Sequence, residues 1–155
     1  MEKEITVRRI RPEELDSLIA LYAHLHRKDA PLPTRPTVNA IWTNIVRSPF
    51  FHCIVGEWEN RIVSSCSLAT IPNLTRGARP YGIIENVVTH ADFRKRGFGT
   101  AVLRYTLRLA WEMNCYKVML LTGSKGESMF RFYEGAGFKR GIKTGFIAYP
   151  PEESN

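Results

Sequence analysis

Apolar residues at the start of the chain have the spacing of one strand followed by two helices. Ile5 and Val7 alternate with polar neighbours, which predicts a short strand ending near Arg8. Beyond Pro12 the apolar positions recur every three or four residues, as on the buried face of a helix: Leu15, Leu18, Ile19, Tyr22 and Leu25. The prolines of the loop Asp29–Pro36 end this helix. A second helix carries Val38, Ile41, Trp42 and Ile45 and ends near Pro49.

The rest of the chain alternates between β-rich stretches and two further helices. Aromatic and β-branched residues predict strands over Phe50–Val55, Ile62–Ile71 and Tyr81–Thr89, the first two forming an antiparallel hairpin. The later elements are a helix over about Gly99–Asn114, a buried strand over Tyr116–Thr122, a helix over about Glu127–Glu134 and a last strand over Phe138–Tyr149.

This order, β-α-α-β-β-β-α-β-α-β, predicts an α/β fold of the α+β type, in which helices cover a mixed central sheet. A chain of 155 residues has the common size of one domain. We therefore expect a single domain over residues 1–149 and a loose tail over residues 150–155.

The net charge narrows the choice of partner. Lys and Arg number 22 against 15 Asp and Glu, a formal charge of +7, which suits an anionic partner. The excess is spread over both halves of the chain, which argues against binding to nucleic acid. No apolar run approaches the roughly 18 residues of a membrane span, and no signal segment is visible, so neither a membrane nor secretion is expected.

The three cysteines, Cys53, Cys66 and Cys115, are widely spaced. Their odd number and spacing match neither a disulfide framework nor a metal site. We expect free thiols, no metal and a reducing, cytoplasmic location.

The most informative stretch is the basic, glycine-containing turn at 94–100, which lies between the strand Tyr81–Thr89 and the next helix. Free amides at a helix N-terminus attract anions, and glycine lets a phosphate approach the backbone closely. A Rossmann fingerprint would need a small residue where Val102 stands, and no stretch has the Gly-Lys-Ser/Thr order of a Walker loop. The turn predicts a polyphosphate site of another kind, against the alternative of a solvated basic turn.

Two motifs resemble the GNAT superfamily of acyl-CoA-dependent N-acetyltransferases. Arg94, Gly97 and Gly99 fill the signature of Arg or Gln, two residues, Gly, one residue, and Gly or Ala. Downstream, Tyr133 through Gly137-Phe138 resembles the Tyr-x-x-x-Gly-Phe ending of the family's fourth helix. The resemblance covers nearly the whole chain and is most specific over residues 83–138. It implies a mostly antiparallel sheet with strands four and five splayed apart, and acetyl-CoA as the co-substrate.

The resemblance also implies roles for individual residues. The CoA pyrophosphate would be held by the turn residues Arg94, Lys95, Arg96, Gly97, Phe98, Gly99 and Thr100. The pantetheine arm would pair with the backbone of Val87, Val88 and Thr89, like an added strand. The asparagine that many members carry seven residues before the tyrosine is replaced here by Gly126.

Two side chains are candidates for proton transfer. Tyr133 occupies the position that supplies the acid for the leaving thiolate in many members, the alternative being a core tyrosine. Glu85 is the candidate base, because strand alternation would put residues 85, 87 and 89 on one side and burying a carboxylate there would be costly. A structural carboxylate paired with an arginine is the alternative for Glu85. His90 and His52 are weaker candidates.

The sequence therefore predicts acetyl transfer to a primary amine of a small molecule, such as an amino sugar, by direct attack in a ternary complex. Alternatives are a catalytically silent acyl-CoA-binding module, a protein or peptide amine as the acceptor, and a nucleic-acid binder using Arg8, Arg9 and Arg11. The expected partners are a small-molecule amine and, as one option, a second copy in a homodimer, with no nucleic acid and no membrane. Arg76 and Arg79 would suit an anionic acceptor.

Overall fold

A computed structural model describes residues 4–26 and 28–151. Its strands are β1 (Thr6–Arg9), β2 (Phe51–Trp58), β3 (Arg61–Ile71), β4 (Tyr81–Thr89) and β5 (Val118–Met119). Its α-helices are α1 (Leu15–Tyr22), α2 (Arg35–Arg47), α3 (Phe98–Glu112) and α4 (Glu127–Ala136). Short 3-10 turns, η1 (Pro12–Glu14) and η2 (Ala91–Phe93), precede α1 and follow β4.

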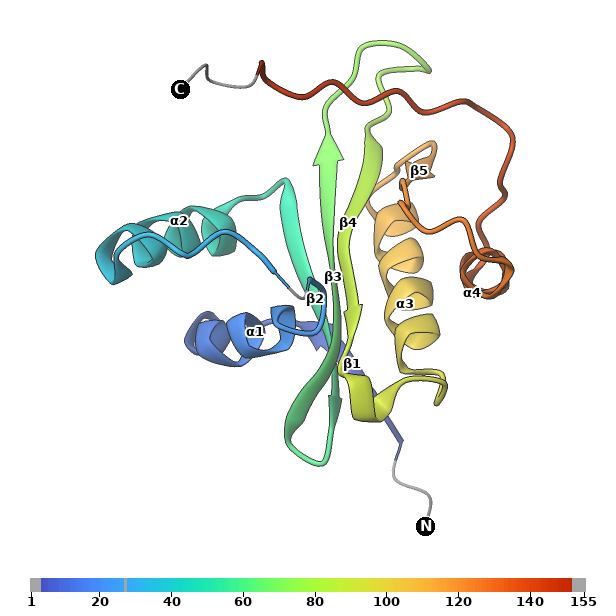
Figure 1. Cartoon of the computed structure of the whole chain (residues 1–155). Helices are drawn as coiled ribbons and strands as arrows, with labels where there is room; N and C mark the ends of the chain where they lie inside the picture. The colour runs from blue at the N-terminus through green and yellow to red at the C-terminus, as the bar shows by residue number, and fades with distance from the viewer. Residues whose placement is uncertain (1–3, 27, 152–155) are drawn as a thin grey trace.

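The strands form one sheet in the order β1-β2-β3-β4-β5, antiparallel except for the parallel pair β4 and β5. Helices α1 and α2 lie on one face, and α3 and α4 lie on the other (Figure 1). The mixed sheet between two helical layers confirms the predicted fold class.

Strand alternation divides the core between the two faces. Ile54 and Cys66 are fully buried in the cluster under α3 and α4, whereas Cys53 and Val55 belong to the cluster under α1 and α2. Successive residues of β2 therefore serve opposite layers, as the two-residue period of a strand requires. The sheet therefore has buried side chains on both faces. Helices α3 and α4, which carry part of the predicted site, pack on one of these faces (Figure 1).

Strands β4 and β5 pair only at Gly82 with Val118 and at Ile83 with Met119. Beyond Ile83, the run of β4 to Thr89 has no strand beside it on that edge in the described part of the chain. The splay that the resemblance implied is therefore present.

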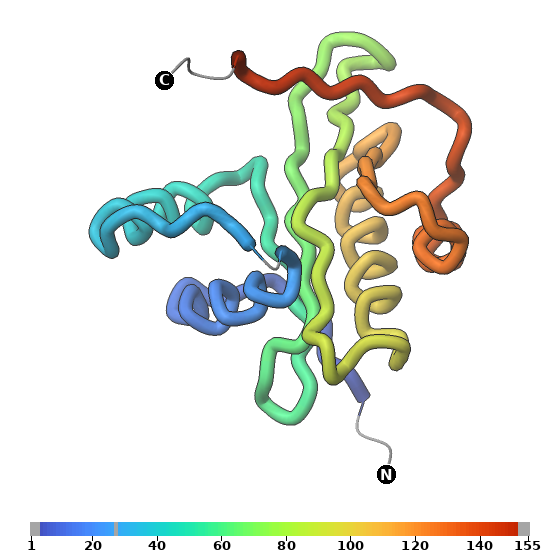
Figure 2. Tube along the Cα trace, viewed as in Figure 1, coloured from blue at the N-terminus to red at the C-terminus, as the bar shows by residue number. Residues whose placement is uncertain are grey.

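The strand predicted over Phe138–Tyr149 is not formed in the structure. This segment follows α4 as an extended chain without strand pairing and crosses the end of the sheet (Figure 2). Strand β5 is also much shorter than the predicted Tyr116–Thr122, so the outer edge of the sheet offers few backbone groups to a sixth strand. Phe146 and Tyr149 of this segment are strongly exposed, so its apolar side chains are not packed against the sheet. An apolar pattern therefore does not by itself place a segment in a sheet. Residues 152–155 of the predicted tail lie outside the described residues.

A β-bulge in β4 overturns the predicted alternation of residues 85, 87 and 89. Glu85 pairs with Ser67 and Val88 pairs with Ser65, so two residues of β4, Asn86 and Val87, face one residue of β3. Asn86 has a φ of 53°, in the left-handed region that asparagine tolerates better than most residues. The bulge shifts the strand by one position, so Glu85 no longer shares a face with Val87.

Candidate active site

The turn after β4 leaves the first backbone donors of α3 without a partner inside the helix. Gly97 caps α3 with a φ of 83°, a left-handed conformation that suits glycine, and no side chain caps the helix. Ala101 is the first residue to donate back into the helix, to Gly97 O at 3.0 Å. The amides of the preceding first turn, from Phe98 to Thr100, have no helical acceptor and lie at the positive end of the helix dipole. This arrangement can bind an anion such as a pyrophosphate.

Arg94 fastens this turn to the rest of the fold. Its Nε donates to Thr89 O at 3.1 Å, and its Nη2 donates to His24 O at 2.9 Å. The guanidinium therefore ties the end of β4 to the segment that follows α1. The side chain that the resemblance assigned to the pyrophosphate is thus already engaged with two carbonyl groups.

Arg96 rests on three aromatic rings. Its guanidinium carbon lies 5.2 Å from the Trp58 ring centroid, 5.3 Å from that of Phe93 and 5.0 Å from that of Phe98. Such cation–π contacts hold the positive charge beside the turn without neutralising it. No sequence pattern singled out Trp58, which lies at the turn of the β2–β3 hairpin. Lys95 is exposed and has a φ of 60°.

Gly99 permits close packing between α3, α4 and β4. A methyl group at this position would lie 3.0 Å from Cζ of Phe132 and 3.2 Å from Oγ1 of Thr89. Thr89 Oγ1 in turn lies 2.9 Å from the Ser64 hydroxyl, within hydrogen-bond distance. The two glycines of the motif therefore have different roles, since a methyl group at Gly97 would meet open space.

Tyr133 lies on α4 on the β5 side of the sheet. Its ring centroid lies 4.9 Å from that of Phe132 and 6.2 Å from that of Phe138. Burial, with smaller contributions from Cys66 and Glu85, raises the pKa of its hydroxyl above the ordinary 10.0. The hydroxyl therefore keeps its proton at neutral pH.

A cavity of about 470 Å³ adjoins Tyr133. It lies between β5, α4 and the extended segment that follows α4, and Lys117, Lys139 and Lys143 contribute positive charge to its lining. The cavity places open space next to the Tyr133 side chain.

Glu85 is exposed, so the expectation that it is a buried carboxylate is wrong. Glu85 pairs in register with Ser67 before the bulge, and the bulge brings Val87, not Glu85, into the core under α3. Glu85 nevertheless lies near enough to Tyr133 to raise the pKa of the phenol.

The two histidines considered in the sequence have separate environments. His90 stacks on His24 with ring centroids 3.9 Å apart, and its Nδ1 accepts a hydrogen bond from Asp92 N at 3.2 Å. Burial, followed by the charge of His24, lowers the pKa of His90. His52 is buried within the sheet, and its Nε2 has no hydrogen-bond partner among the described residues.

The arginines of the loop before β4 make intramolecular contacts. Arg79 donates to Asn114 O at 3.3 Å and to Cys115 O at 3.2 Å, so it ties that loop to the end of α3. Arg76 lies over the ring of Tyr116, 6.0 Å from its centroid. Arg79 thus has a structural role that the sequence did not predict.

At the position of the family asparagine, Gly126 caps α4 without a side chain, and its N–H donates to Ser124 Oγ at 3.5 Å.

Residues 4–26 and 28–151 contain no cluster of His, Cys, Asp and Glu arranged to hold a metal. Within the same residues, every helix is too short or too polar to cross a bilayer.

Comparison with known proteins identifies the family. Residues 15–138 match the family described as Acetyltransferase (GNAT) family. A glucosamine 6-phosphate N-acetyltransferase from Trypanosoma brucei brucei is 32% identical over 140 residues, which cover 88% of this chain and 90% of that protein. One from Schizosaccharomyces pombe is 28% identical over 94 residues, covering 60% of this chain and 82% of that protein.

A solved structure from Agrobacterium tumefaciens str. C58, provisionally described as an acetyltransferase, superposes with a TM-score of 0.87 at 39% identity. The superposition covers 94% of this chain and 99% of that structure. The match of sequence and fold over most of the chain agrees with the two motifs and with the glycine-capped turn at the start of α3. The chain belongs to the GNAT family and is an acetyl-CoA-dependent N-acetyltransferase.

Proposed function

We propose that this enzyme transfers the acetyl group of acetyl-CoA to the primary amine of a small molecule, by direct attack in a ternary complex. The observation that carries the proposal is that β4 and β5 separate beyond Ile83. The gap lies between the turn at the start of α3 and the side chain of Tyr133. The named relatives from Trypanosoma and Schizosaccharomyces support an amino sugar as the first acceptor class to test.

The proposed path of acetyl-CoA follows the unpaired edge of β4. The first-turn amides of α3 receive the pyrophosphate, with Arg96 and Lys95 adding positive charge. The pantetheine arm pairs with the backbone of Val87, Val88 and Thr89, in the stretch where β5 has already separated. Arg94 positions the turn through its two carbonyl contacts.

The proposed chemistry is a single acyl transfer. The neutral amine attacks the thioester carbon, and its proton passes to Glu85, directly or through one water. As the tetrahedral intermediate collapses, the carbon–sulfur bond breaks and the sulfur takes the proton of Tyr133. The raised pKa of Tyr133 keeps that proton in place until the thiolate forms.

The test is a thiol-release assay with acetyl-CoA and a panel of amino sugars, alkylamines, polyamines and peptides. Tyr133→Phe should lower kcat by roughly 10²-fold or more, with little change in acetyl-CoA affinity, because only the proton donor is lost. Tyr105→Phe, on α3 in the same core cluster, is the matched control and should retain activity. An unchanged kcat in Tyr133→Phe removes this residue from the mechanism. Acetyl-CoA binding without thiol release from any amine would favour the silent binding module.

We also propose that the enzyme forms a homodimer. The segment after α4 exposes Ile142, Phe146, Ile147 and Tyr149, which is a large apolar surface for an isolated chain. Sedimentation velocity should give a dimer, and Phe146→Ser with Tyr149→Ser should shift it to the monomer. A wild-type monomer at micromolar concentration would contradict this.

A cytoplasmic location is proposed from the cysteines. Cys53, Cys66 and Cys115 are all free and buried, which fits a reducing compartment. Fractionation of cells expressing the tagged chain tests it, and recovery in a secreted or membrane fraction would contradict it.

A further inference from the structure

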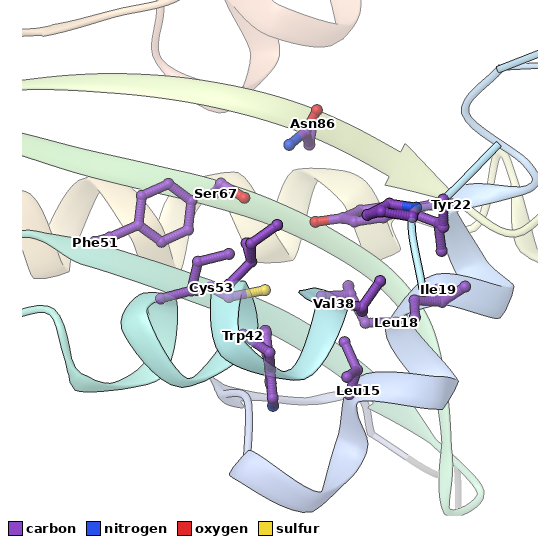
Figure 3. A pocket seen from close by; sticks show the side chains of 14 residues that line it. Leu15, Leu18, Ile19, Tyr22, Val38, Trp42, Phe51, Cys53, Ser67 and Asn86 are labelled. Atoms are coloured by element: carbon purple, nitrogen blue, oxygen red, sulfur yellow. The ribbon is translucent and has the colours of Figure 1, made fainter. Parts of the chain in front are cut away.

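Another cavity, of about 210 Å³, lies on the face of the sheet that carries α1 and α2 (Figure 3). Its walls come from both helices, from the loop that joins them and from β2, β3 and β4. The side chains that matter for its chemistry are Leu18, Ile19, Val38, Ile41, Trp42 and Ile45.

The lining of this cavity is almost wholly apolar. Among residues 4–26 and 28–151, no Asp, Glu, Lys or Arg lines it, and the indole N–H of Trp42 already donates to Pro12 O at 2.7 Å. A phosphate or an ammonium group buried here would lose its hydration and gain no opposite charge, at a high cost in free energy. The chemistry of the cavity therefore fits a hydrocarbon group.

The polar atoms of the cavity gather at its sheet end. Tyr22, Ser67 and Asn86 lie together there, with the tyrosine hydroxyl directed at the other two side chains (Figure 3). Burial raises the pKa of Tyr22 to about 12, and hydrogen bonds to Ser67 and Asn86 oppose part of that rise. The hydroxyl is therefore neutral at physiological pH and can orient a polar group.

The bulge in β4 joins this polar end to the proposed reaction site. Asn86 lines the cavity under α1 and α2, while Val87, the next residue, packs against the cluster under α3. Glu85, the proposed base, directly precedes Asn86. A molecule whose polar group lies at Asn86 is therefore next to the place where the thioester is proposed to lie.

We propose that this cavity binds an apolar group, an aryl or alkyl chain, of the acceptor, whose primary amine lies at the Asn86 end. The inference rests on the proposed acetyl transfer and names the acceptor's chemical class. An apolar cavity of about 150 Å³ holds a benzene molecule, so this one accommodates about six carbons or slightly more. An amino sugar has no group of that kind, so the cavity and the named relatives point to different acceptor classes, and the experiment compares the two directly.

The experiment measures kcat/KM for methylamine, propylamine, hexylamine and decylamine, whose amines differ little in basicity, together with glucosamine and glucosamine 6-phosphate. Burying one methylene should raise kcat/KM by about fourfold at most, so the value should climb steeply to hexylamine and then level off. A value independent of chain length overturns the proposal.

Three variants assign the effect to this cavity. Val38→Phe fills it and should abolish the preference for hexylamine over methylamine. Ile41→Ala enlarges it and should extend the rise toward decylamine, a gain that general destabilisation would not produce. Ala40→Phe places the same ring on an exposed position of α2 outside the cavity and should leave the preference unchanged.

The outcomes separate this inference from the proposed function. Acetylation of amines with no dependence on chain length, or an equal loss for all amines in Val38→Phe, overturns the inference alone. If no amine releases thiol, the proposed function fails, and calorimetric titration of hexylamine into the protein then decides the cavity: binding lost in Val38→Phe supports it, and no binding overturns it. A shift of Val38→Phe from dimer to monomer would assign the cavity to a second copy and also overturn the proposal.

Discussion

Gly99, in the turn between β4 and α3, provides a sharp test of how that turn packs. A methyl group at this position would lie 3.0 Å and 3.1 Å from two carbons of the Phe132 ring, closer than ordinary van der Waals contact. Overpacking of this kind costs about 1–3 kcal/mol. Replacing glycine by alanine in a helix stabilises the helix by up to about 1 kcal/mol, which offsets part of that cost. Gly99→Ala should therefore lose up to about 2 kcal/mol of unfolding free energy, which for a chain of this size lowers Tm by up to roughly 8 °C.

The assay is a double-mutant cycle of Gly99→Ala with Phe132→Leu, in which urea unfolding gives the unfolding free energy of each of the four proteins. With the ring removed, the loss caused by Gly99→Ala should shrink, because only the 3.2 Å approach to Thr89 Oγ1 then opposes the helix preference of alanine. Gly97→Ala is the matched control: its methyl group meets open space, but its φ of 83° costs about 1–2 kcal/mol for any residue with a Cβ, and Phe132→Leu should not relieve that cost. Additive effects of Gly99→Ala and Phe132→Leu would refute the steric explanation.

Other predictions concern the arginine anchors and pH. Arg94→Met should raise KM for acetyl-CoA several-fold with little change in kcat, since the turn loses both carbonyl contacts; an unchanged KM would show that the anchor is dispensable. The hydrogen bond from Arg8 holds the pKa of Glu14 below its ordinary 4.5, so unfolding free energy should be lost as the pH falls below 4.5, and Arg8→Met should flatten that part of the profile. The lowered pKa of His90 means that the folded state binds fewer protons, so stability should also fall as pH drops below 6.5; a His90→Gln variant with the same slope would contradict this.

The local signals in the sequence predict most of the architecture. The helical spacing around Leu18 and Trp42 places both side chains in the core under α1 and α2, as the structure confirms. The glycines of the basic turn mark the start of α3 to within two residues. These features depend on residues near one another in the chain, which is why periodicity and turn chemistry are sufficient to find them.

Features that depend on distant residues were missed. Arg94 was expected to hold a pyrophosphate and Arg79 to suit an anionic acceptor, but each donates to a carbonyl group far away in the sequence: Arg94 to His24 O, and Arg79 to Asn114 O and Cys115 O. Trp58 meets Arg96 only because the hairpin folds back beside the turn. The segment Phe138–Tyr149 has a strand's pattern, but pairing requires a neighbouring edge that the sequence does not reveal.

The bulge at Asn86 has the largest functional consequence among these unpredicted features. A regular strand would put Glu85 and Val87 on one face and leave Asn86 on the other. The extra residue instead separates Glu85 from Val87, so that Val87 packs toward α3 while Asn86 lines the cavity under α1 and α2. One short piece of β4 can therefore serve a cofactor on one side and an acceptor on the other. Because a two-sided transfer site needs both groups within a few ångströms of the same backbone, this local irregularity is the feature of the fold that best fits acetyl transfer.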